Sequence, residues 1–131
     1  MQLTIKTKKR EELIDITKEI EVLISKSKIK EGLCFLFVPH ATAGLTINEN
    51  ADPNVKQDIL NFLSKLVPQG KWSHDQVDRN ADAHIKSSLI GSSVVVPIQN
   101  GKLQLGTWQG IMFCEFDGPR ERKVILTCIE R

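Results

Sequence analysis

Three histidines are the residues best suited to chemistry in this chain, and they fall at His40, His74 and His84. Imidazole is the commonest protein ligand for zinc, and a catalytic zinc site takes three protein ligands and leaves one position for water or substrate. The spacing matches neither HExxH nor a zinc-finger pattern. It fits equally well with ordinary histidines that are hydrogen-bonded at the edge of the core, so the pattern alone leaves both interpretations open.

Other polar side chains could take part in a site. Glu49 follows a strand-like run of alternating character, where its carboxylate can act as a ligand or a general base. Arg120 and Arg122 lie in a predicted hairpin tip, and their guanidinium forks could hold a phosphate or simply be solvated. A nucleophilic Cys114 paired with a histidine is disfavoured, because its neighbours are apolar and nothing nearby would stabilise a thiolate.

Composition sets limits on the function. The chain has 131 residues, of which 40% are hydrophobic and 26% charged, as in one compact domain over residues 1–131. The formal net charge of +2 is too small to predict nucleic-acid binding. No apolar run reaches the roughly 18 residues that span a bilayer, and the first residues lack the apolar core of a signal peptide, so we expect a cytoplasmic protein with no membrane partner. Cys34, Cys114 and Cys128 lie in apolar runs and are expected to be reduced and buried.

The first elements that must position these residues are short strands and two helices. Alternation predicts strands at residues 3–5 and 13–16, then a helix capped by Thr17. The apolar run at 33–38 is typical of a strand covered on both faces. Asp52 and Pro53 mark a helix start. Its predicted buried stripe consists of Val55, Ile59, Phe62 and Leu66.

The second half is predicted to contain one more helix and then strands. Asn80 is expected to cap a short helix whose buried face is Ala81, Ile85 and Leu89, with His84 at the edge of that face. Asn100-Gly101 predicts a tight hairpin, and residues 109–116 and 123–129 predict a second one. Trp108, between the two, is either a core anchor or a stacking surface, and the core is favoured. Strands at the chain ends and helices in the middle predict an α+β class with antiparallel sheets.

Four segments together resemble the YjbQ-like family, whose members are often labelled secondary thiamine-phosphate synthase enzymes. The segments are HATAGLTINENADP at 40–53, NADAHIK at 80–86, GTWQGI at 106–111 and EFDGPR at 115–120. The likeness covers essentially the whole chain. It implies an α+β fold with a β-sandwich-like core, assembled as a homotrimer.

The resemblance also implies a histidine-lined pocket that can hold a divalent metal ion, either zinc or, with a diphosphate substrate, magnesium. The expected metal ligands are His40, His74 and His84. The expected catalytic residues are Glu49, His84 and Arg120. The expected substrate-binding residues are Asn48, Asn80, Trp108, Gln109 and Arg120.

Two function classes follow from this reading. The first is a metal-dependent enzyme that acts on a small phosphorylated or heterocyclic substrate. Its principal reaction is unassigned, and it has a weak activity that joins a pyrimidine diphosphate to a thiazole phosphate. The second is a non-catalytic homotrimer that binds a metal or a small molecule. Turnover that is lost in His84→Ala while the trimer persists would distinguish the two classes.

Overall fold

The computed structural model describes residues 1–131 as eight strands, three α-helices and one short 3₁₀ helix. The strands are β1 (Gln2–Lys6), β2 (Glu12–Asp15), β3 (Gly32–Phe37), β4 (Ala43–Glu49), β5 (Ser93–Gln99), β6 (Lys102–Leu103), β7 (Gln109–Glu115) and β8 (Glu121–Glu130). The helices are α1 (Thr17–Ser27), α2 (Pro53–Leu66) and α3 (Ala81–Ile90), with the 3₁₀ helix η1 (Ser73–Gln76) before α3. This order confirms the predicted α+β class. None of the helices is both long and apolar enough to cross a bilayer.

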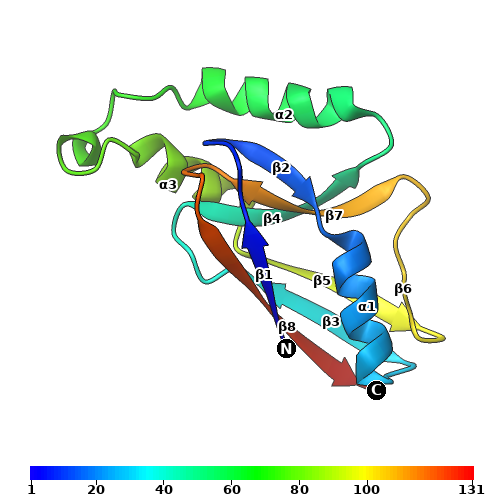
Figure 1. The fold of residues 1–131 in the computed structure, drawn as a ribbon. Helices are drawn as coiled ribbons and strands as arrows, with labels where there is room; N and C mark the ends of the chain where they lie inside the picture. Colours follow the sequence, from blue (N-terminus) through cyan, green and yellow to red (C-terminus); the bar gives the residue numbers. More distant parts are fainter.

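The strands form two antiparallel sheets that pack face to face. The larger has the order β1-β8-β3-β5-β6 and the smaller the order β2-β7-β4. Helix α2 lies over the outer side of the smaller sheet, and the larger sheet lies on its other side (Figure 1). The smaller sheet is therefore a central layer, which explains why β7 is buried along almost its whole length.

Alternate side chains of β7 enter two different cores. Ile111 and Phe113 belong to the main core, which also contains Ile20 and Ile24 of α1. Met112 and Cys114 point the other way, into a smaller core with Leu63 of α2. Because successive side chains of a strand point to opposite faces, one strand can join both cores.

The outer face of the larger sheet is uncovered. Cys34 and Leu36 of β3 are fully buried, whereas Leu33 on the opposite face is 41% exposed. The exposed apolar side chains continue across the neighbouring strands with Val95 of β5 and Ile129 of β8. The prediction that residues 33–38 are covered on both faces is therefore wrong within a single chain.

The two predicted hairpins have different outcomes. Asn100 and Gly101 join β5 to β6 with φ of 53° and 74°, as a type I′ turn requires, so this hairpin is confirmed. The second hairpin is wrong, because β7 pairs with β2 and β4 while β8 pairs with β1 and β3. The segment 117–120 instead carries the chain from one sheet to the other.

The helix starts are partly as predicted. Asp52 caps α2 and accepts a hydrogen bond from the Asn54 N–H at 2.9 Å. At α1 the N-cap residue is Ile16, and Asp15 accepts a hydrogen bond from the Thr17 N–H at 3.0 Å, so Thr17 is not the cap. The predicted stripe of α2 is only half right. Phe62 and Leu66 are 63% and 55% exposed, and Leu63 is the buried residue of this helix.

Candidate functional site

Two of the three histidines line one polar cleft of about 620 Å³. His40 lies just past the end of β3, and His84 projects from α3. The cleft is completed by the connection from β7 to β8. Its other lining residues are Pro39, Ala41, Thr42, Asp78, Asn80, Asp117, Arg120 and Arg122.

His40 is held by a backbone hydrogen bond. Its Nε2 accepts the N–H of Lys123 at 2.9 Å, at a point where β8 has no further pairing with β3. Burial and the nearby Arg122 guanidinium lower the pKa of His40, so the ring is neutral at pH 7. A neutral imidazole that accepts through Nε2 must carry its proton on Nδ1. The structure thus assigns His40 as an N–H donor.

His74 and His84 lie side by side. Their ring centroids are 4.8 Å apart with the planes nearly perpendicular. His74 sits on η1, where its Nε2 is 3.5 Å from Asp78 Oδ2. His84 is half-buried, and neither of its ring nitrogens has a hydrogen-bond partner in the protein. Its ring is therefore free to contact a ligand.

The three histidines do not form one metal centre in this arrangement. No group of three His, Cys, Asp or Glu side chains has the geometry to hold an ion. His40 fits poorly as a ligand, because its Nε2 lone pair is already used and its Nδ1 carries the proton. His74 and His84 fit better as a pair, since they are adjacent and uncommitted to backbone groups. Of the three predicted ligands, at most His74 and His84 are thus placed to bind the same ion.

A buried ion pair forms the floor of the cleft. Arg122 is 3% exposed and donates through Nε to Glu115 Oε2 at 2.8 Å and through Nη2 to Thr42 Oγ1 at 2.8 Å. Its Nη2 also contacts Glu115 Oε1. Glu115 is fully buried and further accepts from the Thr7 hydroxyl at 2.9 Å. These contacts fix the guanidinium beside His40.

Arg120 lies at the rim of the same cleft. It is half-exposed, and it donates through Nε to the Asp117 carbonyl at 2.8 Å and through Nη2 to the Asp117 carboxylate at 3.1 Å. Its Nη1 has no protein partner. Asn80 donates to the same carboxylate at 2.8 Å, and its Oδ1 is unpaired. The Asp117 carboxylate therefore links Arg120, in the connection from β7 to β8, with Asn80 at the start of α3.

Asn80 stands at the N-cap position of α3, as predicted, but its side chain makes no capping hydrogen bond, which corrects that part of the prediction. The Ala81 N–H instead donates to Asp75 Oδ1 at 3.0 Å. The predicted apolar face of α3 is only partly right. Ala81 is buried, but Leu89 is 58% exposed, and the polar Asp82 and Lys86 are buried instead. The helix is thus anchored through polar side chains.

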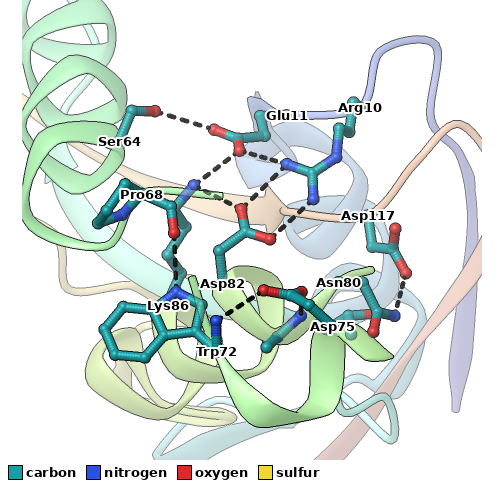
Figure 2. Close-up of polar contacts among 12 residues, drawn as sticks. Arg10, Glu11, Ser64, Pro68, Trp72, Asp75, Asn80, Asp82, Lys86 and Asp117 are labelled. Carbon is teal, nitrogen blue, oxygen red and sulfur yellow. Dashed lines mark hydrogen bonds and ion pairs between the residues drawn. The ribbon is translucent and has the colours of Figure 1, made fainter. Parts of the chain in front are cut away.

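The buried face of α3 carries a four-residue ion cluster (Figure 2). Arg10 donates to both carboxylate oxygens of Asp82, at 2.9 and 3.1 Å. Lys86 donates to Glu11 at 2.7 Å and to Asp82 at 3.1 Å. The hydrogen bonds from Arg10 and Lys86 outweigh the effect of burial and hold the pKa of Asp82 below its usual value. This cluster fixes the orientation of α3, and with it the position of His84.

Four predicted site residues lie elsewhere. In the ladder of β4 with β7, Ala43 pairs with Glu115 at the cleft end and Glu49 pairs with Gln109 at the other end. Six residues of extended strand span about 20 Å. Asn48 is at that far end, and so is Trp108, which is 63% exposed and therefore not a core anchor. Within one chain, the predicted catalytic Glu49 does not reach the histidine cleft.

Comparison with known proteins places the chain in a family. The family model described as UPF0047 protein YjbQ-like matches residues 1–131. The chain belongs to the YjbQ-like UPF0047 family. It is 58% identical over 125 residues to a UPF0047 protein of Methanocaldococcus jannaschii, which covers 95% of this chain and 90% of that protein. It is 51% identical over 123 residues to UPF0047 protein YugU of Bacillus subtilis, covering 92% and 91%.

Solved structures of YjbQ-like proteins share the fold. A YjbQ/UPF0047 family protein from Clostridium acetobutylicum superposes with a TM-score of 0.94 at 50% identity, covering 98% of this chain and 99% of that one. A protein of unknown function from Sulfolobus solfataricus superposes with a TM-score of 0.95 at 37% identity, covering 100% and 96%. These likenesses establish the family and the fold.

Proposed function

We propose that the cleft between His40 and His84 is the active site of an enzyme that acts on a small phosphorylated substrate. The observation that carries the proposal is the donor set on one wall: the Nδ1–H of neutral His40 and the guanidinium of Arg120, next to the buried ion pair of Arg122 with Glu115. Arginine forks recognise phosphate oxygens with charge-assisted hydrogen bonds. The free Nη1 of Arg120 supplies such donors at the cleft rim.

His84 is proposed to transfer a proton to or from the substrate. It lines the same cleft as these donors, and neither of its ring nitrogens has a hydrogen-bond partner in the protein. Histidine is the commonest general acid and base near neutral pH. Helix α3 carries His84, and the ion cluster that includes Asp82 and Lys86 on the buried face of this helix limits its movement.

Thiamine-phosphate synthesis is proposed as a weak activity of this site. The family resemblance suggests it, and the donor wall supports it, because the reaction expels pyrophosphate and its negative charge grows in the transition state. Purified protein supplied with the pyrimidine diphosphate and the thiazole phosphate is expected to form product slowly. A turnover near the roughly 10 s⁻¹ of a typical dedicated enzyme would contradict a secondary role, and no product at all would favour a binding protein.

In a metal-loaded form of the protein, a divalent ion, zinc or magnesium, is proposed to bind beside His74 and His84, where it would polarise a phosphate oxygen or a bound water in place of proton transfer by His84. Zinc titrated into the protein is expected to bind less tightly in His74→Ala and His84→Ala, and with unchanged affinity in His40→Ala. Calorimetric titration measures this. Equal loss of zinc binding in all three variants would contradict the proposal and would support coordination by all three histidines.

We also propose that the chain forms a homotrimer through the uncovered face of the larger sheet. Leu33, Val95 and Ile129 form an apolar patch there, and contiguous exposed apolar surface is typical of interfaces. Val95→Lys and Ile129→Lys are expected to give monomers in light scattering. Val22→Lys, at a similarly exposed valine of α1, is the control and should leave the trimer intact. A parent protein that is monomeric at micromolar concentration would contradict the proposal.

A further inference from the structure

Two cysteines far apart in the sequence face each other on neighbouring strands. Cys34 of β3 and Cys128 of β8 are direct partners in the antiparallel register. Directly opposed residues of a sheet point to the same face, so the two thiols share one environment. Cys34 is fully buried in the main core, and the half-buried Cys128 packs against that core.

The hydrogen-bond pattern shows how closely the two backbones approach at this pair. The Arg131 N–H donates to the Glu31 carbonyl at 3.0 Å, so these residues form a hydrogen-bonded pair. Hydrogen-bonded and non-hydrogen-bonded pairs alternate along an antiparallel ladder. Three steps further along the same register, Cys34 and Cys128 form a non-hydrogen-bonded pair. Cα atoms in such a pair are about 4.5 Å apart, which lies within the range that a disulfide spans.

We propose that Cys34 and Cys128 are a dithiol site that a hydroperoxide converts into an intramolecular disulfide between β3 and β8. Nothing in the proposed phosphate cleft uses either thiol, so this site is independent of that function. The third cysteine offers an internal comparison. Cys114 is fully buried in the smaller core with no cysteine opposite it, because its partners in the ladders are Leu13 and Gly44.

The order of the two steps follows from exposure. Burial and the neighbouring Cys128 thiol raise the pKa of Cys34 to about 12, so Cys34 does not react first. The peroxide meets Cys128, whose sulfur attacks one peroxide oxygen and becomes a sulfenic acid while water or an alcohol leaves. The Cys34 sulfur then attacks the sulfenic sulfur, and its proton leaves with the hydroxide as water. Two thiols and one peroxide thus give one disulfide.

The experiment is peroxide treatment of the native protein, followed by alkylation, digestion without reductant and mass spectrometry. We expect a linked pair of peptides containing Cys34 and Cys128, lighter by two hydrogen atoms than the separate peptides, while Cys114 remains reduced. Cys114→Ser should form the same link, and Cys128→Ser should form none. The oxidised protein should also melt at a higher temperature than the reduced one, because a cross-link restricts the unfolded chain.

Three results would overturn the proposal, and none of them depends on a variant. One is conversion of Cys128 in the parent protein to sulfinic acid while Cys34 stays a free thiol. Another is a disulfide between two chains in place of the intramolecular link. Linkage that forms only after denaturation would likewise show that the native register does not support the bond.

Discussion

Glu115→Gln is expected to lower the free energy of unfolding by about 3–5 kcal/mol, because it leaves the Arg122 guanidinium buried without its counter-charge. Urea unfolding at neutral pH measures the loss. The double variant Glu115→Gln, Arg122→Met removes the uncompensated charge and should recover most of the stability. Glu121→Gln, at an exposed position of β8, is the matched control and should change stability by less than about 0.5 kcal/mol.

The same pair gives the fold a dependence on pH. Burial alone would raise the pKa of Glu115, but hydrogen bonds from Arg122, the Asp117 N–H and Thr7 hold that pKa below its usual value. A carboxyl whose pKa is lowered by folding contributes full stability above its unfolded pKa and loses it as the pH falls through the folded value. Unfolding free energy should therefore decline below about pH 5 in the parent and less steeply in Glu115→Gln. Equal slopes in the two proteins would contradict this account.

His84→Gln is expected to lower the rate of thiamine-phosphate formation by about 10² to 10⁴-fold, the usual contribution of a positioned general acid or base. Gln can still hydrogen-bond but cannot take up a proton near neutral pH, so binding of the half-substrates should persist while kcat falls. The rate is measured from product formation at saturating substrate.

A second variant on α3 shows whether the effect is local. Leu89→Ala changes an exposed residue of the same helix and should leave the rate within about twofold of the parent. An equal fall in both variants would mean that the helix, and not the imidazole, limits the rate. An unchanged rate in His84→Gln would remove His84 from the chemistry.

Local signals in the sequence predicted the fold where neighbouring residues alone decide the structure. Asp52 followed by Pro53 starts α2, and Asn100-Gly101 forms the turn between β5 and β6. Each of these features depends only on backbone groups a few residues away. The segment 117–120 misled the prediction because partner choice is tertiary: β7 finds its partners in the smaller sheet and β8 in the larger one. Apolar alternation identifies strands but does not assign them to sheets.

Helix α3 shows why periodicity failed elsewhere. Its buried face is polar, since Asp82 and Lys86 are matched by Arg10 and Glu11 from the distant segment before β2. A search for an apolar stripe therefore selects Leu89, which is exposed. No pattern within the helix itself reveals that its charges are neutralised from another part of the chain.

The candidate site was predicted in part. His40, Asn80, His84 and Arg120 line one cleft, because the end of β3, the start of α3 and the link from β7 to β8 converge there. Glu115 was missed as part of this site, although a carboxylate ending an apolar strand is a usable signal of a buried ion pair.

The fold separates two sets of residues that the family resemblance had assigned to one site. Asn48 and Glu49 follow the histidine segment closely in sequence, yet β4 carries them to the far end of the smaller sheet beside Trp108 and Gln109. Proximity in sequence is lost along an extended strand at about 3.4 Å per residue. The sequence alone therefore could not show which predicted site residues lie at the cleft end of β4 and which lie at its far end.

Binding of inorganic pyrophosphate, followed by calorimetry and by the NMR signals of His40 and of the Lys123 amide, tests the phosphate cleft most directly. Saturable binding that shifts both signals is expected, and it should weaken about tenfold or more in Arg120→Ala, since a charge-assisted hydrogen bond contributes about 1.5–3 kcal/mol. Arg131→Ala, at an exposed arginine far from the cleft, should bind as the parent does. Absence of saturable binding, or equal weakening in Arg120→Ala and Arg131→Ala, would show that this cleft is not a phosphate-binding site.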